Sequence, residues 1–149
     1  MTDIINIKQI RYGSVMYDEM VQLRHELLRA PIGLTFAKKD LEKDKKDYLL
    51  GAYLAVNNNI VGCCILTPFT SDTVQLRQMA ISENYQRTGI GSKLIMYAEE
   101  MAKHKGYNYI YLHSRKVAID FYLRHGYKTK RKEFIEVGIP HYEMTKKLN

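Results

Sequence analysis

Gln86-Arg87-Thr88-Gly89-Ile90-Gly91 is the stretch around which this chain is organised. It follows a strand-like run, 73–81, and it opens a helix-like run, 90–105. A glycine-containing turn at the start of a helix exposes backbone N–H groups, and these groups bind phosphate together with the helix dipole. The sequence therefore predicts a site for a phosphate-bearing cofactor at this turn.

Two common phosphate-binding motifs are excluded by their spacing. A P-loop requires G-x-x-x-x-G-K-(S/T), whereas here the hydroxyl precedes the lysine, as Ser92-Lys93. A dinucleotide fingerprint requires G-x-G-x-x-G, and Leu94 stands where the third glycine should be. A turn that only reverses the chain would not need the donors of Gln86 and Arg87 at its start. This combination suits a pyrophosphate group.

The order of the expected elements predicts the fold class. A chain of 149 residues, 46% of them hydrophobic, suits one folded domain over residues 1–149. The expected order is a strand, a helix, several strands, a helix, a strand, a helix and closing strands. This order predicts a mixed α/β sheet with helices on both faces. The expected strands are 3–10, 51–56, 60–67, 73–81, 109–112, a strand from 127 onward and 142–148, and the expected helices run from Ser14 to Pro31, over 90–105 and from Ser114 to Gly126.

The net charge of +7 would attract an anionic partner, either a polyphosphate cofactor or a nucleic acid. The densest basic run, 124–132, is typical of a solvated strand and turn, and neither zinc-finger spacing nor an aromatic RNA-binding motif accompanies it. We therefore expect no nucleic-acid partner. Segment 34–48 is charged and irregular, which fits either a short helix and loop near a site or a solvated connection.

The two cysteines and the apolar runs bear on whether the protein binds a metal or spans a membrane. Cys63 and Cys64 are neighbours in a strand-like run, so their side chains are expected to fill opposite faces of the sheet. A metal site needs more ligands at better spacing, and we expect no metal. No apolar run approaches the ~20 residues that span a bilayer, and the first residues do not resemble a signal peptide. The expectation is a cytoplasmic protein with no membrane partner.

Three motifs in order resemble one family. The glycine turn resembles (Q/R)-x-x-G-x-(G/A), the acetyl-CoA motif of the GNAT superfamily of N-acetyltransferases. Residues 118–127, AIDFYLRHGY, resemble its A-x-x-F-Y-x-x-x-G-(F/Y) segment, and residues 137–144, VGIPHYEM, resemble the G-I-P-H ending of its ElaA-like branch. The resemblance implies a mostly antiparallel central sheet, splayed at the cofactor site, and acetyl-CoA as co-substrate.

The resemblance also implies which residues contact the cofactor. In that superfamily the pantetheine arm lies in the gap between the splayed strands, and the pyrophosphate sits on the turn. Arg115 stands where the family often has an asparagine, and it would place a cation near the cofactor phosphates. The implied set is Met79, Ala80 and Ile81 on the strand, Gln86, Arg87, Thr88, Gly89, Ile90, Gly91 and Ser92 in the turn, and Arg115.

Direct transfer of an acyl group from a thioester to an amine needs a neutral amine, a polarised carbonyl and a proton for the departing thiolate. Tyr122 matches the family's tyrosine acid, although spacing alone would also fit a core aromatic. The candidates for the base are His113 and Glu83, the second acting through water. Either could instead be a partly solvated residue at the end of its strand or in a turn.

The acceptor pocket of the superfamily draws on the first helix and the loop after it. Arg24 and Arg29 lie there, and a guanidinium can bind an acid on the acceptor, unless both belong to a solvated helix face. His141 is a third candidate for the pocket lining.

The sequence thus predicts an acetyl-CoA-dependent N-acetyltransferase that acts on a primary amine of a small molecule or peptide. The alternative is a non-catalytic acyl-CoA-binding sensor, which would keep the glycine turn but need no acid or base. Neither the acceptor nor the oligomeric state, including a homodimer, follows from the sequence, because fold-level similarity does not fix the substrate.

Overall fold

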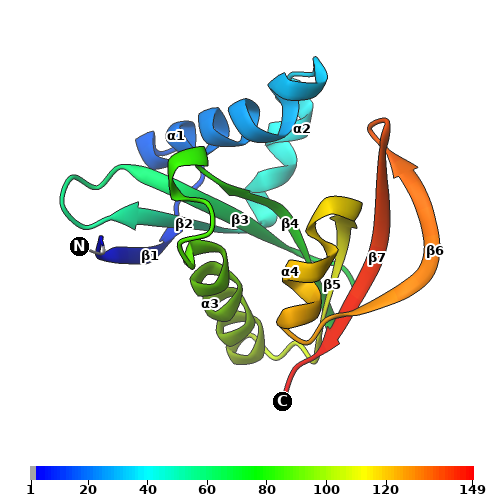
Figure 1. Ribbon diagram of the computed structural model, residues 1–149. Coiled ribbons are helices and arrows are strands. Elements are labelled where there is room, and N and C mark those ends of the chain that lie inside the picture. The colour runs from blue at the N-terminus through cyan, green and yellow to red at the C-terminus, as the bar shows by residue number, and fades with distance from the viewer. Residues whose placement is uncertain (1–2) are drawn as a thin grey trace.

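A computed structural model describes residues 3–149, apart from the side chain of Arg131, so the first two residues of the expected domain lie outside it. Seven strands form one sheet in the order β1-β2-β3-β4-β5-β7-β6 (Figure 1). β4 and β5 are parallel and the other neighbouring pairs are antiparallel, which confirms the mostly antiparallel sheet. The strands are β1 (Ile5–Ile10), β2 (Tyr48–Leu54), β3 (Ile60–Pro68), β4 (Thr73–Ile81), β5 (Tyr109–Arg115), β6 (Lys128–Glu136) and β7 (Ile139–Lys147).

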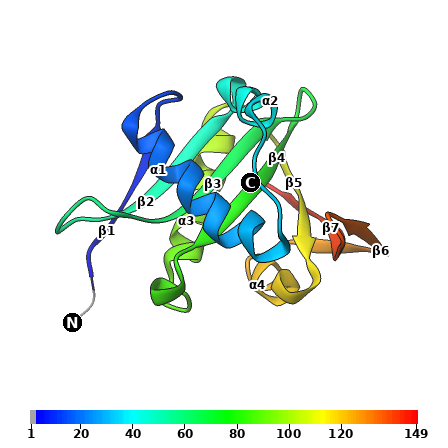
Figure 2. The same cartoon turned by 90° about the horizontal axis from the view of Figure 1, so that it is seen from above.

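Helices cover both faces of this sheet, as the element order predicted. α1 packs against β3 and β4, α3 packs against β1 to β4, and α4 lies beside β5 and β6 (Figures 1 and 2). Within residues 3–149, no helix is long and apolar enough to cross a membrane. The α-helices are α1 (Val15–Arg24), α2 (Lys38–Glu42), α3 (Ile90–His104) and α4 (Ile119–Arg124).

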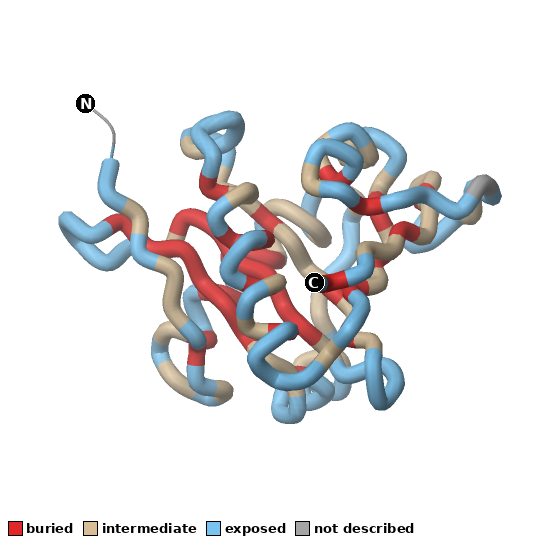
Figure 3. Tube along the Cα trace, turned by 90° about the horizontal axis from the view of Figure 1, so that it is seen from below, coloured by how far each residue is buried: buried red, intermediate tan, exposed pale blue. Residues whose placement is uncertain are grey.

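Each face of the sheet carries its own hydrophobic core, and the adjacent cysteines divide between the two. Cys63 packs with Met20 in the core under α1, whereas Cys64 packs with Leu94 in the core under α3. The prediction of opposite faces is therefore confirmed. Figure 3 shows the buried residues concentrated along the central strands, with the connections exposed. Burial raises the pKa of both thiols, to about 12 for Cys63, so both remain protonated apolar fillers.

The local signals at the first helix are partly confirmed. Ser14 caps α1, since its hydroxyl accepts a hydrogen bond from the Tyr17 N–H (3.1 Å). The α-helix does not continue to Pro31, however. It widens into a π-helical segment, His25–Arg29, and a 3₁₀ turn, Ala30–Ile32, before Gly33 ends it in a left-handed conformation. π-Helical turns of this kind are frequent at functional sites.

The last two strands differ from the prediction at their boundaries. β5 runs on to Arg115 because β7 pairs with it along its whole length. β7 begins at Ile139 rather than at Tyr142, since Pro140 lies near the strand start, where a missing N–H is tolerated. The turn between β6 and β7 is therefore the dipeptide Val137-Gly138.

The parallel pair β4–β5 separates part-way along its length. Pairing runs from Thr73 and Tyr109 to Leu76 and Leu112. Beyond that point β4 stays bonded to β3, and β5 stays bonded to β7. A bulge marks the departure: Gln78 has φ +57°, and the β3–β4 register shifts beside it. The splayed sheet implied by the family resemblance is therefore present.

A buried ion pair lies against this bulge. Arg24, 1% exposed, contacts Asp44 between Nη1 and Oδ2 at 2.9 Å, and the Tyr17 hydroxyl donates to the same oxygen at 2.6 Å. The Nε–H of Arg24 donates to Oε1 of Gln78 at 3.4 Å. Segment 34–48 contains the short helix α2, and Asp44 anchors it to α1. Its Phe36 ring lies against Arg29, which lines the cavity described below, so the expectation of a short helix and loop near a site is confirmed.

Arg24→Leu is expected to lower the free energy of unfolding by about 3–5 kcal/mol, because it leaves the Asp44 carboxylate buried without its cation. Urea unfolding measures the change. The double variant Arg24→Leu/Asp44→Leu should recover much of the loss, since the uncompensated charge is gone. A loss below about 1 kcal/mol in the single variant, which is typical of an exposed pair, would contradict this account.

Candidate functional site

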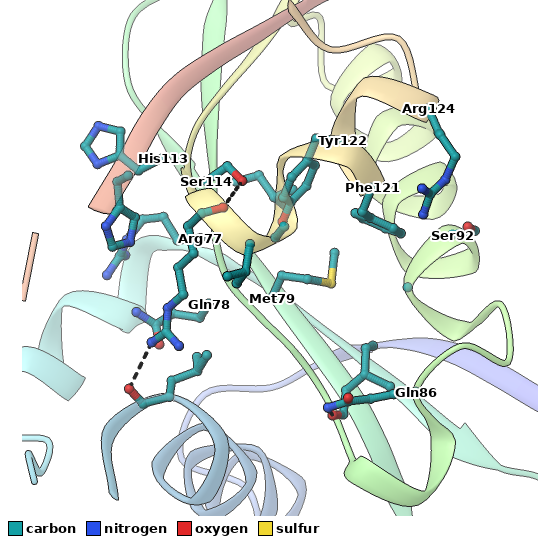
Figure 4. A pocket seen from close by; sticks show the side chains of 18 of the residues that line it. Arg77, Gln78, Met79, Gln86, Ser92, His113, Ser114, Phe121, Tyr122 and Arg124 are labelled. Carbon is teal, nitrogen blue, oxygen red and sulfur yellow. Dashed lines mark hydrogen bonds between the residues drawn. The ribbon is translucent and has the colours of Figure 1, made fainter. Parts of the chain in front are cut away.

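The separation of β4 and β5 opens a cavity of about 920 Å³. Its volume falls in the range of small-molecule and cofactor sites. Its lining comes from the π-helical segment, β4, the glycine turn, β5, the 3₁₀ turn Lys116–Ala118, α4 and the β6–β7 hairpin. Figure 4 shows Tyr122 and Phe121 projecting from α4, across from Met79 and Gln78 of β4.

The glycine turn presents unpaired donors at one end of the cavity. Within residues 3–149, the backbone N–H groups of residues 87–92 have no intramolecular acceptor. Arg87 and Gly89 both have left-handed backbones, with φ +63° and +88°, and the 15-residue helix α3 begins directly after them. Free N–H groups and the positive end of a helix dipole form an anion site, so the turn fits a pyrophosphate.

Side chains around the turn hold its shape. The Gln86 amide donates to the Ile81 carbonyl at 3.0 Å, so in this structure it braces the turn. A Cβ added at Gly91 would come within 3.2 Å of the Phe121 ring, and the glycine thus lets α3 approach α4 closely. Ser92 Oγ lies 2.9 Å from Nε2 of His125, whose pKa is lowered by burial.

The implied strand residues divide between the two faces of β4. Met79 and Ile81 line the cavity, whereas the Ala80 side chain is buried in the core under α1. Across the gap, Arg115 lines the cavity and donates from Nη2 to the Leu28 carbonyl at 3.2 Å. Its guanidinium therefore joins β5 to the π-helical segment.

Tyr122 lies at the centre of the lining. Its residue surface is 7% exposed, and its ring packs edge-on against Phe121 and Tyr127. Its hydroxyl has no hydrogen-bond partner among the described residues, although it borders the cavity. Burial, with a smaller contribution from the Cys64 thiol, raises the pKa of Tyr122 well above its ordinary value. The hydroxyl therefore keeps its proton and is free to donate it.

The two candidates for the base lie in different surroundings. His113 lines the cavity, with Nδ1 3.0 Å from Oε1 of Glu136 and Nε2 2.7 Å from the Tyr111 hydroxyl. Glu83 is exposed in a 3₁₀ turn after β4 and is outside the cavity lining. The structure therefore brings His113 to the site and leaves Glu83 away from it.

The three candidates for the acceptor pocket also separate. Arg29 lines the cavity, and its guanidinium carbon lies 4.6 Å from the centre of the Phe36 ring. His141 is buried and lines the cavity. Arg24 is outside the lining, because its ion pair with Asp44 holds it in the core. Both predictions for Arg24, a contact with the acceptor and a position on a solvated helix face, are therefore wrong. Glu136 also lines the cavity, and no local sequence pattern marks it, because it is a lone carboxylate before a turn.

Comparisons with known proteins identify the family. The sequence model of the Acetyltransferase (GNAT) family matches residues 14–127. The protein belongs to this family. A curated relative, the uncharacterized protein YyaT of Bacillus subtilis, is 36% identical over 77 residues, which are 52% of each chain. The chain thus spans about half the length of such relatives.

Solved structures share the fold along nearly the whole chain. Escherichia coli ElaA has a TM-score of 0.81 at 18% identity, covering 95% of this chain and 99% of its own. A GNAT family acetyltransferase from Elizabethkingia anophelis with acetyl-CoA bound has a TM-score of 0.73 at 22% identity, covering 97% and 98%. At these identities the likeness is one of fold, and it includes β6 and β7, which the family match leaves out.

Val137 occupies an unfavourable backbone conformation in the β6–β7 turn, with φ +47°, followed by Gly138 with φ +75°. A two-residue turn with both φ values positive favours asparagine at its first position and disfavours a β-branched residue. We expect Val137→Asn to raise the free energy of unfolding by about 1 kcal/mol, as measured by urea denaturation. Val56→Asn, at an exposed valine without positive φ, is the control and should change little. A destabilised Val137→Asn would contradict the reading.

Proposed function

We propose that the protein is an acetyl-CoA-dependent N-acetyltransferase that moves an acetyl group directly to a primary amine of a small molecule or peptide. One observation carries the proposal. A single cavity joins the unpaired N–H groups of residues 87–92 to the partnerless hydroxyl of Tyr122, through the gap between β4 and β5.

The residues present fit the cofactor. The N–H groups of the turn and the dipole of α3 would hold the pyrophosphate. The edge of β4 at Met79 to Ile81 has lost its β5 neighbour and would bond the extended arm. Arg115 adds a cation to the same cavity. Bound acetyl-CoA supplies an activated acyl group as a thioester.

The reaction requires one proton to leave the amine and one to reach the sulfur. A neutral amine nitrogen forms a bond to the carbonyl carbon, and the carbon–sulfur bond breaks with its electron pair on sulfur. Tyr122 donates its hydroxyl proton to that sulfur, and the new amide nitrogen gives up a proton that restores the tyrosine. The raised pKa keeps Tyr122 protonated until the thiolate forms, and the same buried surroundings disfavour the charged thiolate and so raise its basicity.

Tyr122→Phe is expected to lower kcat by about 100-fold at neutral pH while leaving CoA affinity unchanged, because only the proton donor is removed. Thiol release measures kcat, and titration calorimetry measures the affinity. Tyr127→Phe is the matched control, because it deletes a neighbouring buried hydroxyl that is hydrogen-bonded to Glu99. Tyr127 is outside the cavity lining, so this variant should keep the wild-type kcat. Equal kcat values for Tyr122→Phe and the wild type would remove Tyr122 from this role.

A thiol-release assay with acetyl-CoA tests the reaction class itself. Polyamines, amino acids, aminoglycosides and peptides each offer a primary amine in a different chemical setting. We expect release with at least one of these classes. Binding of CoA without release for any acceptor would instead support the non-catalytic acyl-CoA sensor.

A further inference from the structure

A chain of polar side chains crosses β5, β7 and β6 at the end of the cavity beyond Arg115. On β5, Tyr111 and His113 lie two residues apart and so share a face, as do His141 and Glu143 on β7. The antiparallel register places His113 opposite Glu143. Glu136 ends β6 just before the turn. His113, Glu136 and His141 line the cavity.

The hydrogen bonds of this chain occupy both ring nitrogens of His113. The Tyr111 hydroxyl donates to Oε1 of Glu143 at 2.9 Å, and its oxygen lies 2.7 Å from Nε2 of His113. Nδ1 faces a carboxylate oxygen of Glu136 at 3.0 Å, which can only accept, so Nδ1 carries a proton and donates it there. No ring nitrogen of His113 is therefore left free to receive a proton from a substrate amine.

The neighbouring charges agree with this assignment. The hydrogen bond from Tyr111 lowers the pKa of Glu143, with help from Lys130, whose Nζ is 3.4 Å from that carboxylate. Burial and the same hydrogen bond raise the pKa of Tyr111 to about 12. Glu143 is thus ionised and Tyr111 keeps its proton at neutral pH. Phe134 packs edge-on against the His113 ring, at 4.9 Å between centroids.

His141 differs, because one of its ring nitrogens faces the cavity wall without a hydrogen bond. Its Nδ1 is 2.8 Å from the Ile139 carbonyl, which can only accept, so Nδ1 carries a proton. Nε2 lies 3.6 Å from Oε2 of Glu136, beyond hydrogen-bond distance. In the neutral ring, Nε2 and Oε2 are two acceptors that face each other without a donor between them.

We propose that Glu136 Oε2 and His141 Nε2 together bind the primary ammonium group of the acceptor, and that His113 is a positioning residue that holds Glu136. The proposal rests on the N-acetyltransferase function and deepens it. The ammonium donates one N–H to each acceptor and passes one proton to Nε2. The amine is left neutral with its lone pair, and His141 becomes an imidazolium that is hydrogen-bonded to the Ile139 carbonyl and faces the Glu136 carboxylate until water removes the proton. We therefore assign the general base to His141 instead of His113.

This arrangement selects a primary ammonium over a neutral or anionic group. Among the described residues, Glu136 is the one carboxylate in a lining that also contains five arginines, so a cation in this cavity has Glu136 as its acidic partner. The five are Arg29, Arg77, Arg87, Arg115 and Arg124. A charge-assisted hydrogen bond to a carboxylate contributes more than a neutral one. The acceptor class is therefore an amine that arrives protonated.

Binding of n-butylammonium to the CoA-saturated protein tests the site without requiring turnover. Glu136→Gln should weaken its affinity about 10–100-fold, because one charged acceptor is lost. Glu133→Gln removes a carboxylate from the same strand that pairs with Lys116 outside the cavity, and it should match the wild type. n-Butanol, the uncharged analogue, should not compete. Equal affinities for Glu136→Gln and the wild type, or no binding to the wild type, would overturn the proposal.

Nitrogen-15 NMR of the histidine rings gives a second, independent readout. At pH 7.5 we expect a proton on Nδ1 of both rings, and we expect the Nε2 signal of His141 to shift on addition of n-butylammonium. An Nε2 signal of His141 that does not respond would overturn the proposal. Neither measurement depends on acetyl transfer, so their failure is distinct from an absence of thiol release.

Discussion

The loss of pairing between β4 and β5 beyond Leu76 and Leu112 is the constraint on which the site depends. Backbone N–H and C=O groups inside a sheet are almost always paired. Here β4 keeps its bonds to β3 and turns aside at the Gln78 bulge, while β5 keeps its bonds to β7. The edges that face the gap are left for a ligand. The Arg24–Asp44 pair, buried beside the bulge, supports this geometry from the α1 face.

The gap also explains why distant parts of the chain share one cavity. β4 leads directly into the glycine turn, β5 leads into α4, and the β6–β7 turn closes the far end. The unpaired N–H groups of residues 87–92, the Tyr122 hydroxyl and the Glu136–His141 pair therefore all lie around one opening. Each comes from a rigid element or from the residue next to one, which keeps a reacting group in place.

Local rules in the sequence predicted much of the fold. The glycine turn, the start of the first helix at Ser14 and the opposite-facing cysteines each depend on neighbouring residues alone. Tyr122 was found through its motif. The burial of Arg24 was not predicted, since its partner Asp44 lies 20 residues away in a segment without periodicity. Glu136 was missed because its contacts arise only when β5, β7 and β6 pair, and no local pattern marks a lone carboxylate before a turn.

A crystal structure of the protein with acetyl-CoA would show whether the β4–β5 gap holds the cofactor. We expect the pyrophosphate on the N–H groups of residues 87–92, the arm along Met79 to Ile81, and the thioester sulfur within hydrogen-bond reach of the Tyr122 hydroxyl. Acetyl-CoA bound outside the β4–β5 gap, or with its sulfur away from Tyr122, would contradict this expectation.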